Sequence, residues 1–397
     1  MSQFSSLTPM PPDALLGLMT AYRADPREEK FDLGVGVYRN EAGDTPVMSA
    51  VSKAEGLILQ AQTTKVYEGP RGNTDFCAAI ESFVFGEGAA AIEEGRTLSF
   101  TSPGGCGALF LGTGLMKRMG VKTVWVSRPT WPNHPNVVKF LGLEIAEYGY
   151  ADPETGTLDL AAMMADLEKT GHGDGVIIQG PCHNPTGIDL SVDGWRKVGA
   201  LVKERGLIAM LDVAYQGFAN GLEEDAAGVR AFIEASGDAM ISYSCSKNFG
   251  LYRERTGCFL AAGDSAEGIA AAATHVASIA RASYSMPPAH GSAIVATILG
   301  DAGLRAEWEA ELTQMRDRMI SLRKALAEAL VSKTGSNRMA AVAQQNGMFS
   351  QLPISKDAIA NMRETNGLYM PNSGRINIAG LTLNDIPQIA EIIASQS

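Results

Sequence analysis

Between residues 97 and 262 the sequence alternates short apolar runs with amphipathic stretches, and this alternation constrains the fold more than any other feature. The apolar runs predict seven strands, at Thr97–Thr101, Thr123–Ser127, Glu144–Tyr150, Val176–Gln179, Leu207–Asp212, Met240–Tyr243 and Gly257–Ala262. The stretches between most of them predict helices, at Ala108–Met119, Pro135–Leu141, Asp159–Lys169, Val192–Arg205 and Ala226–Glu234. Continuous apolar runs are typical of strands covered on both faces. The sequence therefore predicts an α/β fold in which helices sandwich a mostly parallel, seven-stranded sheet.

The two ends of the chain predict a smaller unit beside this sheet. At 397 residues the chain is too long for one compact core, so we expect two domains. The tail predicts strands near 347–352, 367–370 and 375–379 and helices near 356–365 and after 384, and residues 301–330 predict a long connecting helix. Residues 1–12 are polar and end in prolines, which indicates an arm, and Asp13 is expected to cap the helix that follows.

Composition narrows the class of protein. Lys and Arg number 33 against 44 Asp and Glu, and a net charge of −11 argues against nucleic acid or an anionic membrane as a partner. Five scattered cysteines without a Cys-x-x-Cys pair indicate neither a disulfide framework nor a zinc site, and we expect no metal. The chain shows no secretory signal and no run long enough to span a membrane, so we expect a cytoplasmic protein.

Lys247 lies in a serine-rich loop that follows the apolar run ending at Tyr243. A buried lysine amine is costly unless it is neutralised or used, and one use is a Schiff base with the aldehyde of pyridoxal phosphate (PLP). Ser244, Ser246 and Arg255 would then supply donors for the phosphate. For this stretch alone, a surface lysine in a polar loop is an equally good interpretation.

Other distinctive residues also follow predicted strands, where ligands bind in open α/β sheets. The glycine-rich loop 102–107 suits a phosphate at a helix N-terminus, although a tight turn is as good an interpretation. Trp131 can stack on an aromatic ring or pack in the core, and Asn184 offers a neutral donor within a turn signal. Asp212 ends a buried strand and needs a cationic partner, such as a pyridinium N–H, while Tyr215 follows three residues later.

Two arginines and a pair of glycines complete the candidates. Arg281 and Arg375 are possible carboxylate clamps, since a guanidinium grips a carboxylate through two parallel bonds, although each alone is more often a surface residue. Gly34 and Gly36 interrupt the apolar run 31–38. Such glycines indicate a close backbone approach or a bulge, and from this run alone a bulge is the better interpretation.

Together these residues resemble the aspartate and aromatic amino acid aminotransferases among the fold type I PLP enzymes. The matching stretches are Leu33–Tyr38, Trp131–His134, Cys182–Gly187, Asp212–Phe218, Ser246–Arg255 and Ser373–Asn377. They follow the order of that family and cover nearly the whole chain. The resemblance implies a large PLP-binding domain at 45–311, a small α+β domain built from 13–44 and 312–397, and an arm at 1–12.

The resemblance also implies a role for each matching residue. Lys247 would form the Schiff base and move the Cα proton, with Asp212 and Tyr215 as the other catalytic residues. The implied cofactor-binding set is Gly105, Cys106, Trp131, Asn184, Asp212, Tyr215, Ser244, Ser246, Lys247, Arg255 and Tyr67 of the partner subunit. The implied substrate-binding set is Gly36, Trp131, Asn184, Arg375 and Arg281 of the partner subunit. The expected reaction is ping-pong transamination between aspartate or an aromatic amino acid and 2-oxoglutarate, in a homodimer with shared active sites.

Some positions depart from the family pattern. Cys106 stands where the family usually has Thr or Ser, Met286 and Val66 where aspartate-preferring members usually have Asn, and Arg39 where they often have Lys. Most of these changes make the pocket rim less polar, so we expect a broad enzyme that takes dicarboxylates and aromatic substrates in one pocket. A PLP β-lyase or decarboxylase on the same fold is the alternative. A non-catalytic PLP-fold module is disfavoured because Lys247 is present.

Overall fold

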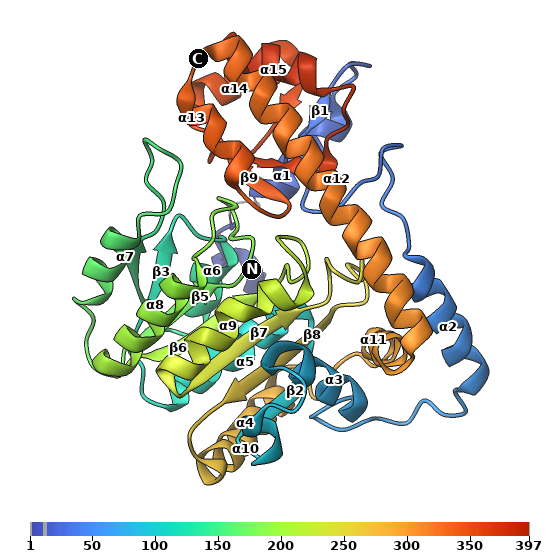
Figure 1. The fold of residues 1–397 in the computed structure, drawn as a ribbon, viewed down its shortest axis with the longest axis vertical. Coiled ribbons are helices and arrows are strands. Elements are labelled where there is room, and N and C mark those ends of the chain that lie inside the picture. Colours follow the sequence, from blue (N-terminus) through green and yellow to red (C-terminus); the bar gives the residue numbers. More distant parts are fainter. Residues whose placement is uncertain (1, 11–13, 397) are drawn as a thin grey trace.

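The structure, a computed structural model, describes residues 2–10 and 14–396, so the predicted cap Asp13 and the end of the predicted arm lie outside it. One seven-stranded sheet forms its centre, in the order β2-β8-β7-β6-β5-β3-β4 (Figure 1). The strands are β2 (Thr97–Pro103), β3 (Thr123–Arg128), β4 (Glu144–Gly149), β5 (Gly175–Gln179), β6 (Ile208–Val213), β7 (Ala239–Ser244) and β8 (Thr256–Ala262). Only β8 runs against its neighbours. The predicted sheet is confirmed.

Helices cover both faces of this sheet, because successive side chains of each buried strand point to opposite sides. One hydrophobic cluster joins the sheet to α5 (Gly104–Arg118), α6 (Asn133–Phe140) and α10 (Ala266–Ser283). The cluster on the other face includes α3 (Thr74–Phe85), α8 (Val192–Arg205) and α9 (Leu222–Ser236). The neighbouring residues Ile177 and Ile178 of β5 belong to opposite clusters.

The remaining helices lie around this body and at the chain ends. They are η1 (Gln3–Ser6), α1 (Ala14–Ala24), α2 (Ser49–Ala61), α4 (Ala90–Glu93), α7 (Leu160–Leu167), α11 (His290–Gly300), α12 (Ala302–Thr334), α13 (Asn337–Ala340), η2 (Ala341–Gln344), α14 (Lys356–Asn366), η3 (Ile378–Gly380) and α15 (Ile386–Ala394). Helix α12 starts beside α11 and α2 and rises to the C-terminal elements in Figure 1. Among the described residues, no helix is both long enough and apolar enough to cross a membrane.

Both chain ends contribute to a third hydrophobic cluster, which lies apart from the large sheet. It joins Leu33 near the N-terminus to Leu326 of α12 and Ile389 of α15. Two short strand pairs belong to this region: β1 (Phe31–Asp32) is parallel to β10 (Leu368–Tyr369), and β9 (Phe349–Gln351) is antiparallel to β11 (Arg375–Asn377). These contacts support the predicted small domain, whose boundaries at 44/45 and 311/312 stay a prediction.

The glycine run after β1 differs from the expected bulge. Strand β1 ends at Asp32, and the following backbone is bound by β11 instead. Arg375 Nη2 donates to the carbonyl of Gly34 at 2.7 Å, and Asn377 Nδ2 donates to that of Val37 at 2.8 Å. A Cβ atom on Gly34 would lie 2.5 Å from Leu18 Cδ2. The bulge interpretation is therefore wrong, and the run is a close-packed segment.

Candidate active site

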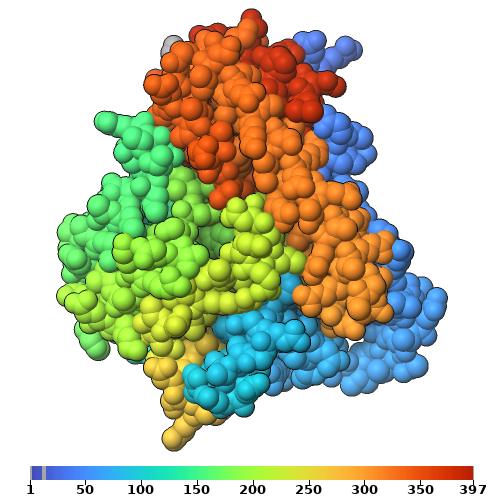
Figure 2. Space-filling view, viewed as in Figure 1, coloured from blue at the N-terminus to red at the C-terminus, as the bar shows by residue number. Residues whose placement is uncertain are grey.

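A cavity of about 280 Å³ lies at the carboxyl edge of the sheet, between the sheet and the chain-end elements. Figure 2 shows a hollow where the orange C-terminal residues meet the green body. Most of the predicted residues line the cavity: Gly36, Gly105, Cys106, Trp131, Asn184, Asp212, Tyr215, Ser244, Ser246, Lys247, Arg255 and Arg375. They converge because β2, β3, β5, β6 and β7 all end at this edge.

Lys247 lies in the loop after β7, and its side chain is half-buried in the cavity. Its Nζ lies 5.0 Å from the centre of the Tyr215 ring and makes no hydrogen bond or ion pair to the part of the chain that the structure describes. Burial lowers the pKa of this amine, and the nearby Asp212 carboxylate opposes that shift. The surface-lysine interpretation is wrong, because the side chain lines a cavity. The lowered pKa means that a larger fraction of this amine is neutral than in an exposed lysine.

Asp212 is the penultimate residue of β6 and is hydrogen-bonded to a buried histidine. His134 Nε2 lies 2.9 Å from Asp212 Oδ2, and His134 Nδ1 lies 2.8 Å from Thr130 Oγ1. The Trp131 ring packs edge-on against His134 at 5.4 Å between centroids. Only 8% of Asp212 is exposed. The hydrogen bonds through His134 to Thr130 orient its carboxylate, whose other oxygen is available at the cavity.

Gln179, the last residue of β5, fixes the backbone of Asn184 through two hydrogen bonds. Gln179 Oε1 accepts from the Asn184 backbone N–H at 2.9 Å, and Gln179 Nε2 donates to the Asn184 carbonyl at 2.9 Å. His183 is fully enclosed beside Tyr150, and burial lowers its pKa to about 3, so this ring is neutral and structural. Within the described chain, the side-chain Oδ1 of Asn184 is buried without a hydrogen-bond partner. The loop therefore presents an unsatisfied amide to the cavity.

The N-terminus of α5 and the loop after β7 form a cradle. Gly104 has φ +69°, and a Cβ atom there would lie 2.7 Å from Arg255 Nη2. A Cβ on Gly105 would lie 3.0 Å from Ser244 Cβ, so side chains at both positions would fill the space. Cys106 follows on the helix, and burial raises the pKa of its thiol. Free N–H groups, hydroxyls and a guanidinium around one hollow suit a phosphate.

Arg375 faces this cradle from β11, on the other side of the cavity. Only 6% of its surface is exposed, and burial lowers the pKa of its guanidinium. Its Nη2 atom donates to the Gly34 carbonyl. Its Nε atom is buried and has no hydrogen-bond partner among residues 2–10 and 14–396. An incompletely paired buried guanidinium suits a carboxylate ligand. Arg375 is thus built into the site, contrary to a surface role.

Two predicted residues lie away from this cavity. Tyr67 is 83% exposed in the segment after α2, and Arg281 is exposed at the end of α10, where it donates to Ser285 Oγ. Both were expected to serve the partner subunit, and that expectation stays a prediction.

Eight residues that line the cavity were not predicted as site residues: Leu15, Met19, Gly34, Val35, Gln179, Ala214, Tyr252 and Phe349. Tyr252 lies within the Lys247 stretch, and its hydroxyl accepts from the Tyr38 backbone N–H at 3.0 Å. Leu15 and Met19 carry the helical periodicity of α1, which indicates packing and not a site. Phe349 is an apolar residue in a short strand, so no local signal identifies it.

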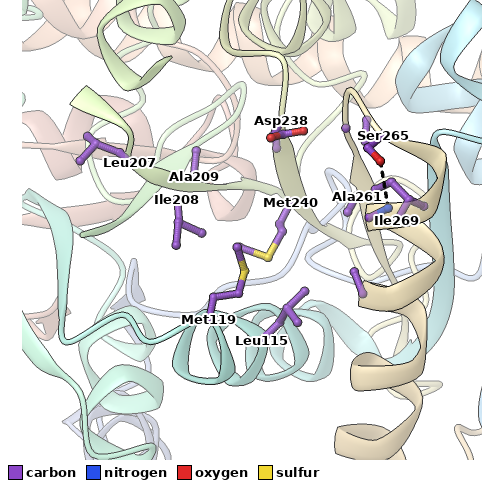
Figure 3. A pocket seen from close by; sticks show the side chains of 15 residues that line it. Leu115, Met119, Leu207, Ile208, Ala209, Asp238, Met240, Ala261, Ser265 and Ile269 are labelled. Carbon is purple, nitrogen blue, oxygen red and sulfur yellow. Dashed lines mark hydrogen bonds between the residues drawn. The ribbon is translucent and has the colours of Figure 1, made fainter. Parts of the chain in front are cut away.

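A second cavity of about 300 Å³ lies at the opposite, amino edge of the sheet. Figure 3 shows Met119 and Met240 pointing toward each other across it, beside Leu115 and Ile208. It has two polar side chains: Ser265 caps α10, and Asp238, which is exposed, accepts from the Asp264 N–H through Oδ1. The apolar character of this cavity offers no group for catalysis.

Comparison with known proteins agrees with the geometry. Residues 28–393 match the family model "Aminotransferase class I and II". The chain belongs to this family. It is 44% identical over 394 residues to an aspartate aminotransferase of Salmonella typhi, and 43% over 389 residues to an aromatic-amino-acid aminotransferase of Paracoccus denitrificans. These alignments cover 99% and 98%, respectively, of this chain and of each relative.

Solved structures show the same fold. An aromatic-amino-acid aminotransferase from Burkholderia pseudomallei, covalently bound to pyridoxal phosphate, superposes with a TM-score of 0.96 at 36% identity. The superposition covers 100% of this chain and 99% of that one. The predictions of family, fold class and an aminotransferase enzyme are confirmed.

Proposed function

We propose that this aminotransferase uses PLP, held on Lys247, to exchange amino groups between aspartate or aromatic amino acids and 2-oxoglutarate in a ping-pong reaction. The observation that carries the proposal is the unpaired Lys247 amine, with its lowered pKa, in the same cavity as the Asp212–His134 pair. A neutral amine and an oriented carboxylate are the two groups that PLP chemistry requires of a protein.

The residues present fit the cofactor. The cradle of Gly104, Gly105 and Arg255 has the donors and the room for a phosphate. The free oxygen of Asp212 suits a pyridine N–H, and the unsatisfied amide of Asn184 and the Tyr215 hydroxyl suit the ring oxygen. When bound, PLP supplies a protonated ring that withdraws electrons from the substrate Cα. In this chain Cys106 leaves the phosphate without one of the hydroxyl donors usual in the family.

The side chains divide the work of proton transfer and orientation. Lys247 Nζ takes the proton from the substrate Cα and returns one on the cofactor side, and its lowered pKa favours the neutral form that can accept a proton. His134 orients Asp212, which would hold the ring nitrogen. Burial raises the pKa of Tyr215, so its hydroxyl stays protonated as a donor.

Substrate binding is assigned to Arg375 and the cavity rim. The guanidinium of Arg375, with its unpaired Nε, would grip the α-carboxylate next to the Gly36 backbone. Leu15 and Met19 give the mouth of the cavity an apolar wall that suits an aromatic side chain. We assign dicarboxylate recognition to Arg281 of the partner subunit, in a cytoplasmic homodimer that also places Tyr67 of the partner subunit near the phosphate.

The test is a half-reaction. The purified protein is saturated with PLP and mixed with L-aspartate or L-phenylalanine without a keto acid, while the visible absorbance of the cofactor is followed. We expect the band to disappear with formation of pyridoxamine phosphate and the matching keto acid. Release of ammonia, pyruvate or carbon dioxide with an unchanged band would instead identify a β-lyase or decarboxylase.

The breadth of substrate use has its own test. In an Arg281→Ala variant, we expect kcat/KM for aspartate to fall far more than that for phenylalanine, because only aspartate has a side-chain carboxylate to lose its partner. A matched Arg305→Ala variant, at an arginine that pairs with Glu309 on α12, should change neither. Equal losses on the two substrates would contradict this assignment.

A further inference from the structure

We propose that Arg323 and Phe349 form a positioning unit for the substrate carboxylate, in which Arg323 holds strand β9 and Phe349 on that strand orients Arg375 beside Tyr215. The proposal rests on the proposed function, because it takes Arg375 as the carboxylate-binding group. Neither residue belongs to the predicted site.

Arg323 is a buried cation on α12 whose hydrogen bonds go to β9 and to the residue Gly347 just before it. Only 3% of its surface is exposed. Its Nη1 donates to Ser350 Oγ, and its Nη2 donates to the carbonyls of Gly347 and Phe349, the latter at 3.2 Å. No carboxylate lies within ion-pair distance of it in the described part of the chain. Since a buried guanidinium is costly unless its donors are satisfied, these bonds to the backbone and side chain of β9 fix that strand in place.

The register of β9 with β11 then places Phe349 against Arg375. Arg375 is paired with Gln351, and Phe349, two residues earlier, points to the same face of the strand pair. The Arg375 Cζ atom lies 4.4 Å from the centre of the Phe349 ring, within the range of a cation–π contact. The Phe349 ring therefore contacts one face of the guanidinium, and the Gly34 carbonyl binds its Nη2 atom. Arg375 also lines the cavity, where we assign it the substrate carboxylate.

Phe349 also contacts the groups assigned to the cofactor ring. Its ring meets that of Tyr215 edge to face, with centroids 6.1 Å apart. Gly187, which ends the Asn184 loop, has φ +69°, and a Cβ atom there would lie 2.5 Å from the Phe349 carbonyl oxygen. Phe349 therefore lies between Arg375, which we assign to the substrate carboxylate, and Tyr215, which we assign to the ring oxygen. Its contacts with both keep these two groups at a fixed distance, as a substrate that must reach both requires.

The experiment compares carboxylate binding with turnover in the PLP-loaded enzyme. We expect Phe349→Leu to raise the Kd for 3-phenylpropionate, a carboxylate that has no amino group to transfer, and the KM for aspartate by about tenfold each. The kcat should change by less than about threefold, because Lys247 and Asp212 are untouched. Phe349→Tyr keeps the ring over the guanidinium and should restore both constants. Phe85→Leu, the same change at a buried phenylalanine of α3 outside the cavity, is the matched control.

Arg323→Met tests the other half of the unit. We expect a smaller rise in the same Kd. The double variant with Phe349→Leu should bind no more weakly than Phe349→Leu alone, because Arg323 acts on Arg375 only through the position of the Phe349 ring. An unchanged Kd in folded Phe349→Leu, or independent losses that multiply in the double variant, would overturn the proposal. If leucine prevents folding, Phe349→Met supplies the same test. The Kd is measured without turnover, so failure of amino-group transfer by the unmodified enzyme would reject only the proposed function.

Discussion

The two edges of the central sheet carry cavities of similar size and opposite chemistry. At the carboxyl edge, five strand ends bring together an amine, a carboxylate and a guanidinium group, and buried polar atoms of Asn184 and Arg375 lack partners among the residues that the structure describes. At the amino edge, the lining is mainly methionine, leucine, isoleucine and alanine, and its two polar side chains are Ser265, which caps α10, and the exposed Asp238. Cavity volume therefore does not distinguish a site from a packing defect. The chemistry of the lining does, because the carboxyl-edge cavity collects an amine, a carboxylate, an amide and guanidinium groups, whereas the amino-edge cavity is almost wholly apolar.

The sharpest test of this contrast removes the amine. Lys247→Ala should lower the rate of the half-reaction by at least about 10⁴-fold, because the other described residues that line the cavity include no amine or imidazole to take the proton. Stopped-flow absorbance with aspartate measures it. Lys197→Ala, at a surface lysine paired with Asp193 on α8, is the control and should leave the rate unchanged. Near-normal turnover of Lys247→Ala would remove the basis for the carboxyl-edge site.

Neutralising the carboxylate comes next. Asp212→Asn should lower the half-reaction rate by about 10²-fold or more, because an amide cannot keep a ring nitrogen protonated as a carboxylate does. The visible spectrum reports whether the variant still holds PLP, so loss of cofactor is separated from loss of rate. Asp166→Asn, at a carboxylate that binds the Gly149 N–H outside the cavity, is the control.

Matched alanine-to-leucine variants compare the two cavities directly. Ala214→Leu adds three carbon atoms to the lining of the carboxyl-edge cavity. It should weaken substrate binding about tenfold, because the larger side chain takes up space that the substrate needs. Ala272→Leu adds the same atoms to the amino-edge cavity and should leave KM and kcat within about twofold, since that cavity takes no part in the reaction. Equal losses in the two variants would show that the edges are coupled.

The smallest effect concerns the pKa of Lys247. In the cofactor-free protein, burial holds this pKa below the ordinary value of about 10.4, so the neutral amine becomes the main form at a lower pH than in a free lysine. Acetylation by acetic anhydride, followed by peptide mass spectrometry, should therefore level off at a lower pH for Lys247 than for N-acetyl-lysine methylamide. A curve that levels off at the same pH as the free amine, or above it, would contradict the lowered pKa.

The sequence predicted the parts of the molecule that depend on local pattern. Seven apolar runs became the seven strands, shifted by one or two residues, and the residues after five of them met in one cavity because parallel strands end at a common edge. The glycine run 31–38 was misread as a bulge because its partners, Arg375 and Asn377, lie more than 300 residues away along the chain. Nothing in that run alone indicates those bonds.

Sequence patterns were thus enough for the α/β architecture, the family, and the residues that motifs carry at strand ends, such as Lys247 and Asp212. The folded structure was needed to show which described atoms are left unsatisfied and which cavity is polar. It was also needed to show that the Phe349 ring, on a strand bound by Arg323, packs on Arg375. The difference lies in the distance along the chain over which each effect acts. Periodicity and turn chemistry act over a few residues, whereas burial and hydrogen-bond satisfaction depend on contacts between distant segments that exist only once the chain has folded.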